Sequence, residues 1–132
     1  ANQPESQPTK TLRHDTHLPA ELPGFNVTDA VSRLMGNSEL LLKLISLFCL
    51  ENCNDIKVIR QALAQRNNTQ ALERLHSLKG IAGNIGAEVV ARQAQLLEKQ
   101  LSEHRLDNIP ALLDDLDNAM QQVLASGRSV IP

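Results

Sequence analysis

The sequence predicts an all-α protein: an antiparallel four-helix bundle preceded by a short N-terminal helix. From Phe25 onward, apolar residues recur at helical spacing, and no segment shows the alternation that is typical of a half-buried strand. The connections between the expected helices are short, which favours antiparallel packing of successive helices. With 132 residues, 42% of them hydrophobic, the chain is large enough for one domain with its own core.

The chain divides into three predicted parts. Residues 1–24 are rich in Pro, Gln, Thr and charge without an apolar period, which predicts a linker or flexible tail. The bundle is expected over residues 25–127, and a short tail over residues 128–132. His14 and His17 flank an acid in the first part, but with no further ligand nearby they are a weak candidate for a metal site.

Two helices are expected first. The leading one has Thr28 as a candidate cap and ends at Gly36. Ser38 can cap the next, longer helix over residues 38–63. Between residues 40 and 50 this helix is apolar nearly all round, as expected for a helix covered on two sides, with the leading helix as its lid.

Polar and sulfur-containing residues interrupt the long second helix. Asn52 and Asn54 mark a candidate kink. Cys49 and Cys53 are four residues apart and share a helix face, and two helical residues at that spacing rarely meet disulfide geometry. They are interpreted as two small core residues of a protein in a reducing compartment, which predicts a cytoplasmic location.

Three more helices complete the expected bundle. They are predicted over about residues 70–85, 88–103 and 109–127. Pro110 suits the first turn of the last helix, and Gly127 is expected to close it.

Composition excludes two classes of partner. The net charge is −2, and the chain has no Trp, no Tyr and only two Phe, so neither a basic footprint nor stacking platforms for nucleic acid are present. No apolar run reaches 18 residues, so no direct membrane contact is expected.

The third expected helix contains the stretch HSLKGIAGNIG, which begins at His76. At about 100° per residue, Lys79, Gly80 and Gly83 fall within about 60° of His76 and form one stripe. Gly86 lies at the helix end and is an ordinary C-cap candidate. His76 is predicted to point away from the core, because the opposite side of the helix is a full apolar face. That face consists of Ala71, Leu75, Leu78, Ala82 and Ile85.

The stripe combines residues that suit phosphoryl chemistry. Each glycine inside a helix costs about 0.5–1 kcal/mol relative to alanine, and Gly80 and Gly83 leave room for the backbone of a partner beside His76. A neutral imidazole nitrogen is a nucleophile toward phosphorus, and Lys79 can neutralise an anion on it. Leu72, one turn earlier, is a candidate docking contact. No phosphate loop and no acid cluster suited to Mg²⁺ is present, so a donor must bring its own metal.

These residues resemble a known family. HSLKGIAGNIGA is similar to the signature of histidine-containing phosphotransfer (HPt) domains, in which x-x-Lys-Gly and small residues follow a His. The upstream segment FNVTDAVSRLMGNSELLLKLISLF resembles the N-terminal part of such domains, and LLEKQL, with Glu98, is also similar. The resemblance covers about residues 24–125.

The resemblance implies a role for each residue of the site. His76 would accept the phosphoryl group, Lys79 would steady it, and Gly80 would give a receiver domain room to dock. Glu98 falls where relatives often have Glu or Gln and would orient the ring, whereas Gly83 is often Ala in relatives.

The resemblance also implies partners. The chain would relay phosphoryl groups between aspartates of response regulator receiver domains, with Mg²⁺ supplied by the receiver and no cofactor or kinase activity of its own. It would be the C-terminal module of a hybrid sensor kinase and a monomer.

Two alternatives remain at this stage. A helical adaptor could bind a partner through the same bare face without being phosphorylated. A histidine kinase core usually has an acid after its His and needs an ATP-binding domain, whereas Ser77 follows His76 and 132 residues leave no room for such a domain.

Overall fold

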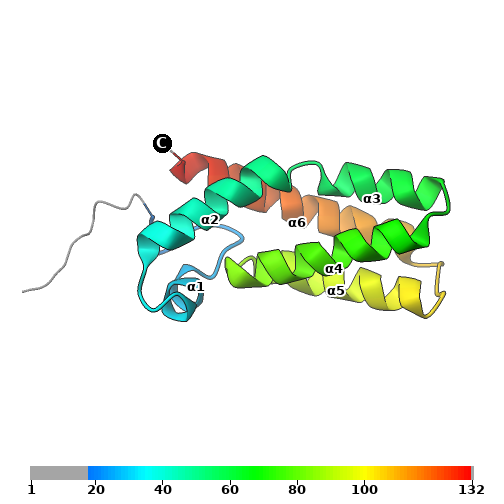
Figure 1. The fold of residues 1–132 in the computed structure, drawn as a ribbon, viewed down its shortest axis with the longest axis horizontal. Coiled ribbons are helices and arrows are strands. Elements are labelled where there is room, and N and C mark those ends of the chain that lie inside the picture. The colour runs from blue at the N-terminus through cyan, green and yellow to red at the C-terminus, as the bar shows by residue number, and fades with distance from the viewer. Residues whose placement is uncertain (1–17, 132) are drawn as a thin grey trace, which may run out of the picture.

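The computed structural model describes residues 18–131. Six helices follow one another in this part of the chain, and they are α1 Val27–Arg33, α2 Ser38–Glu51, α3 Asp55–Ala64, α4 Asn68–Asn84, α5 Glu88–Ser102 and α6 Ile109–Val130. In Figure 1, α3, α4, α5 and α6 run alternately up and down the long axis, and α2 continues the line of α3. The predicted all-α antiparallel bundle is confirmed, with α2 and α3 together forming its first side.

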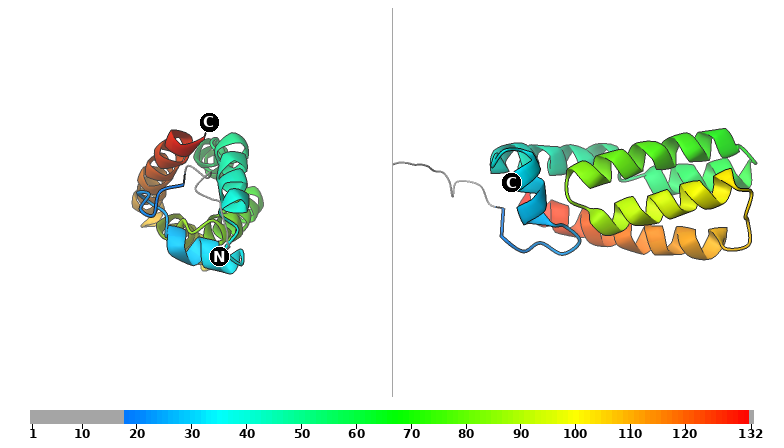
Figure 2. Two further views of the ribbon diagram at one scale, coloured as in Figure 1. Left: turned by 90° about the vertical axis from the view of Figure 1, so that its left-hand side faces the viewer. Right: turned by 90° about the horizontal axis from the view of Figure 1, so that it is seen from below.

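The helices enclose one apolar core. Each contributes buried residues at helical spacing, as Leu75 and Leu78 do in α4 and Leu97 and Leu101 do in α5. Seen end-on in Figure 2, the helices surround the long axis, and α1 lies across one end. His14 and His17 lie outside the described residues.

The expected single helix over residues 38–63 is in fact two helices. Asn52 ends α2, and its side-chain Nδ2 donates a hydrogen bond of 2.8 Å to the carboxylate of Asp55, at the start of α3. Both residues are buried, so the polar interruption is satisfied inside the protein rather than in solvent. A kink was therefore too weak a prediction: the side-chain bond stabilises a complete break.

The predicted helix caps were each displaced along the chain. Asn26, not Thr28, caps α1 by accepting a hydrogen bond of 3.1 Å from the backbone N–H of Asp29. Asn37, not Ser38, caps α2 in the same way through the N–H of Leu40, at 2.9 Å. In both cases an asparagine oxygen reaches the free N–H three residues later, which is the standard N-cap interaction.

The lid predicted for α2 covers less of it than expected. The apolar residues Leu41 and Ile45 are buried, but the outer side of the helix stays open to solvent. Leu47 is partly exposed and Leu50 is 74% exposed. Apolar residues lie nearly all round α2, but this pattern does not show that neighbours cover the helix on two sides.

Residues on both sides of the expected bundle, residues 25–127, pack against it. Leu22, assigned above to the linker, is buried, and its carbonyl accepts a hydrogen bond of 2.9 Å from the N–H of Phe25. At the other end, Gly127 does not close the last helix, because α6 continues to the buried Val130. A Cβ at position 127 would lie 2.7 Å from Cys49 Sγ, so this glycine permits α6 to approach α2 closely.

The two cysteines are free thiols in the structure. Cys49 is buried, and Cys53 is partly buried against the core, as expected for small core residues. Burial raises the pKa of the Cys49 thiol, which keeps it in the protonated and unreactive form.

Candidate functional site

Helix α4 carries the candidate site and is fixed firmly at both ends. Asn67 caps its start, accepting a hydrogen bond of 3.1 Å from the N–H of Gln70. After its last turn, Gly86 adopts a φ of +79°, which a residue with a side chain rarely does. The apolar face of the helix is fully buried, which fixes the rotation of α4 about its own axis. This face consists of Ala71, Leu75, Leu78 and Ala82.

That rotation places His76 on the outside of the bundle, as predicted. Its side chain is 71% exposed. Its Nδ1 atom lies 3.0 Å from Oε2 of Glu98, on α5. An ionised carboxylate can only accept a hydrogen bond, so Nδ1 carries the ring proton in this pair. The lone pair of the neutral ring is then on Nε2, at the opposite edge of a side chain that is mostly exposed.

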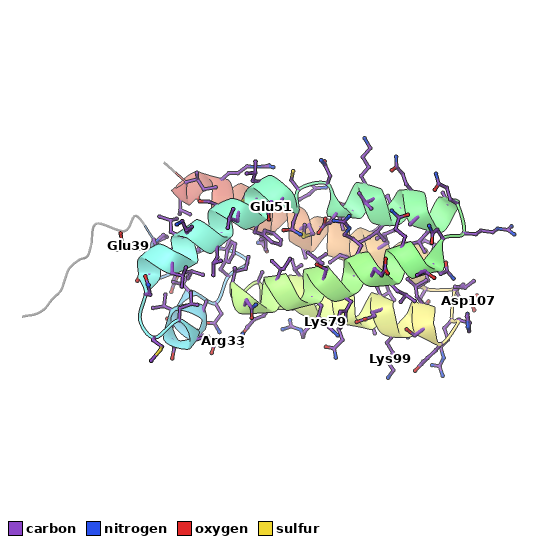
Figure 3. All side chains as sticks on the ribbon, viewed as in Figure 1. Arg33, Glu39, Glu51, Lys79, Lys99 and Asp107 are labelled. Atoms are coloured by element: carbon purple, nitrogen blue, oxygen red, sulfur yellow. The ribbon has the colours of Figure 1, made fainter. Side chains whose placement is uncertain are left out.

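Glu98 also binds the lysine of the predicted stripe. Its Oε1 atom lies 3.0 Å from Nζ of Lys79, so one carboxylate contacts two side chains of α4. Burial alone would raise the pKa of Glu98, but the hydrogen bonds from Lys79 and His76 outweigh it and lower that pKa from its ordinary value. Figure 3 shows Lys79 where α4 meets α5.

The two glycines of the stripe leave an open surface beside His76. A Cβ added at Gly80 or Gly83 would meet no neighbouring atom within 4 Å in the described part of the chain. Close packing within the domain therefore does not require either glycine. Gly86 is different, since a Cβ there would lie 2.7 Å from the carbonyl oxygen of Asn26.

Leu72 differs from its prediction as an exposed docking residue. It is partly buried and packs against the apolar core. On the helical wheel, Leu72 lies about 60° from the buried Leu75, at the edge of the buried face, which explains the difference. Only part of its side chain is available to a partner.

Sequence reasoning missed two arginines that link α4 to its neighbouring helices. Arg33 of α1 donates a hydrogen bond of 2.6 Å to the Gly83 carbonyl, and it also pairs with Asp29 at 3.0 Å. Figure 3 shows Arg33 on α1 near the last turn of α4. Arg74 of α4 pairs at 3.2 Å with the buried Asp55 of α3. The Arg33–Gly83 and Arg74–Asp55 contacts depend on how the helices pack, and no local sequence signal indicates them.

The described residues offer neither a metal-binding cluster nor a membrane-spanning helix. Within residues 18–131, no cluster of three or more His, Cys, Asp or Glu side chains could coordinate an ion. None of the helices there has both the length and the apolar character that a membrane crossing requires. On the exposed side of α4 and α5, the fold brings together the imidazole of His76, the ammonium of Lys79 and the carboxylate of Glu98 that contacts both.

Sequence comparison identifies the family to which this all-α bundle belongs. The family model for the Hpt domain matches residues 43–126, a span that includes His76, Lys79 and Glu98. The chain belongs to the Hpt domain family. Searches of curated proteins and of solved structures gave no significant match.

Membership of the family establishes the general activity. Hpt domains are phosphoryl-carrier modules of two-component signalling and not kinases, and they interact with the receiver domains of response regulators.

Proposed function

We propose that His76 accepts a phosphoryl group from the aspartate of one receiver domain and passes it to the aspartate of a response regulator. The observation that carries this proposal is the 3.0 Å contact between His76 Nδ1 and Glu98. It assigns the ring proton to Nδ1 and leaves Nε2 as the nucleophile on a side chain that is mostly exposed.

The transfer step balances without an additional acid or base. The Nε2 lone pair attacks the phosphorus of the aspartyl phosphate, the bond between phosphorus and the aspartate oxygen breaks, and a carboxylate leaves. The ring keeps its Nδ1 proton and gains positive charge, which the negative charge of the phosphoryl group that it now carries offsets. Onward transfer is the reverse: a receiver carboxylate attacks, the N–P bond breaks, and the neutral ring is restored.

The neighbouring residues serve the same step in this proposal. Lys79, one turn along α4 from His76, neutralises charge on the phosphoryl group. Gly80 and Gly83 allow the receiver to approach, because no side chain stands over this part of the helix. The exposed part of Leu72 adds an apolar contact. The domain needs no cofactor of its own, since the receiver brings Mg²⁺ with its phosphorylated aspartate.

The cellular setting is part of the proposal and rests on the family. The domain works as a monomer in the cytoplasm and serves as the C-terminal phosphotransfer module of a hybrid sensor kinase. Its transfer partners are the receiver of that kinase and the receiver of a response regulator.

The test is direct phosphotransfer. The chain is mixed with a ³²P-labelled phosphorylated receiver domain and Mg²⁺, and the label on the chain is tested for lability in acid and stability in alkali. We expect such label on the wild-type chain and none on His76→Gln, whose circular dichroism should match the wild type because His76 lies outside the core.

Two outcomes would contradict the proposal. Equal label on His76→Gln would place the phosphoryl group elsewhere. Binding of the receiver without any label would identify the domain as an adaptor that uses the same surface.

A further inference from the structure

A single carboxylate of α5 binds both reactive side chains of α4. Glu98 uses Oε2 for His76 Nδ1 and Oε1 for Lys79 Nζ, each at 3.0 Å. Its side chain is only 21% exposed, so water competes weakly for either oxygen. Lys79 is thus already paired in the protein without a phosphoryl group.

The imidazole ring stands between the two anions that Lys79 can bind, which are the Glu98 carboxylate and a phosphoryl group on Nε2. Nδ1 and Nε2 lie on opposite edges of the ring, and Glu98 occupies the Nδ1 edge. A phosphoryl group on Nε2 would project from the other edge. The ammonium of Lys79 lies 3.0 Å from Glu98, on the Nδ1 side, so a phosphoryl group on Nε2 attracts it away from the carboxylate.

We propose that Glu98 competes with the phosphoryl group for Lys79 and thereby limits the lifetime of phosphorylated His76. This inference rests on the proposed function. Phosphorylation breaks the Lys79–Glu98 ion pair, and loss of the phosphoryl group restores it. The restored pair favours release of the phosphoryl group, which suits a carrier that must pass the group on. Glu98 acts here as a positioning residue, through Lys79.

The matched variant is Glu98→Gln. Glutamine keeps a side-chain oxygen that can accept the Nδ1 hydrogen bond, but it removes the charge that attracts Lys79. Phosphoramidate can phosphorylate the chain without any receiver: Nε2 attacks phosphorus, the P–N bond of the reagent breaks, and ammonia leaves. Decay of the phosphohistidine signal is then followed by ³¹P NMR after removal of the reagent.

We expect the half-life to increase about two- to fivefold in Glu98→Gln, the range supported by a partly exposed ion pair. In the Lys79→Met background, most of this increase should disappear, because no ammonium remains to be released. Glu103→Gln is the control: it removes a carboxylate just beyond the end of α5 that pairs with Arg105 instead. Its half-life should equal that of the wild type.

Several results would overturn the competition. They are an unchanged or shorter half-life in Glu98→Gln, an equal increase with Lys79→Met present, or failure of phosphoramidate to label His76. The proposed function fails separately, if a phosphorylated receiver transfers nothing to a chain that phosphoramidate does label.

Discussion

Two carboxylates bind α4 from opposite flanks, and they are used differently. Asp55 of α3 is 1% exposed and binds Arg74, while Asn52 completes its hydrogen bonds. Glu98 of α5 lies nearer the surface and binds His76 and Lys79. The first flank is buried and satisfied within the protein. The second ends in an exposed ring, so the same kind of ion pair stabilises the fold on one side and prepares the chemistry on the other.

The largest expected effect is on stability, at the α3 flank. Asp55→Ala should lower the free energy of unfolding by about 2–3 kcal/mol, because Asn52 and Arg74 both lose a buried acceptor. The loss should stay below the 3–5 kcal/mol typical of a broken buried pair, since Arg74 is 39% exposed and water can solvate it. Urea unfolding measures the change.

The control for that prediction is a surface ion pair that also involves α3. Asp114→Ala removes a partner of Arg60, but the Asp114 side chain is 67% exposed. We expect a loss below about 0.5 kcal/mol. If Asp55→Ala and Asp114→Ala lost the same free energy of unfolding, burial of Asp55 would add nothing to stability. The contrast between the two flanks of α4 would then be wrong.

The next prediction concerns the open face of α4. Gly80→Glu should slow transfer from a phosphorylated receiver about tenfold, which corresponds to about 1.4 kcal/mol, because a charged side chain would stand where the receiver approaches. Labelling by phosphoramidate, a small donor, should be unaffected. If rapid-quench kinetics showed unchanged transfer from the receiver, the open stripe would not be a docking surface.

A smaller effect of opposite sign is expected for the second glycine. Gly83→Ala should raise the free energy of unfolding by about 0.5–1 kcal/mol, because the added Cβ meets open space and alanine favours the helix. Gly86→Ala is the comparison: its φ of +79° and the nearby Asn26 carbonyl should make that variant less stable than the wild type. Destabilisation by Gly83→Ala would show that this glycine has a structural role.

The smallest effect is a difference in pH dependence between the two carboxylates. The hydrogen bonds to Glu98 lower its folded-state pKa below 4.5 despite burial, so its contribution to stability is present above that value and is lost as the pH falls through the folded-state pKa. Burial raises the pKa of Asp55 above 3.8 despite Asn52 and Arg74, so the stability gained from its bound proton is present below 3.8 and is lost as the pH rises through the folded-state pKa. The hydrogen bonds to Asn52 and Arg74 contribute in addition to this pH-dependent part.

Unfolding measured from about pH 7 to about pH 3 separates the two carboxylates. The stability advantage of the wild type over Glu98→Gln should shrink as the pH falls. Its stability relative to Asp55→Asn should increase over the same range. Parallel curves for the two variants would contradict the assignment of opposite shifts.

The sequence was sufficient for the fold class and for the outward face of α4. Helical periodicity predicts the bundle, and the wheel around His76 correctly separates the buried side from the exposed stripe. The contact between His76 and Glu98 was indicated only by family resemblance, since the two residues lie 22 positions apart on different helices. Periodicity within one helix carries no information about such a pair.

The remaining errors have physical causes. Asn52 could have ended a helix or bent one, and the choice depends on its bond to Asp55. Gly127 near a helix end could have been a cap or a close-packing residue, and the choice depends on Cys49 of α2. Arg33 reaches the Gly83 carbonyl, and Arg74 reaches Asp55, only after the helices pack. The Asn52–Asp55 bond is local, but periodicity alone does not show that it forms, and the other contacts join different helices.

The open stripe on α4 also has an entropic consequence. Gly80 and Gly83 have no rotamers, so burying them against a partner sacrifices no side-chain freedom. A rotamer-rich side chain at either position would lose about 0.5–1.5 kcal/mol on immobilisation. The two glycines lose backbone conformational entropy when the helix folds, and they lose no more when a partner binds. A surface of this kind associates without first having to order itself.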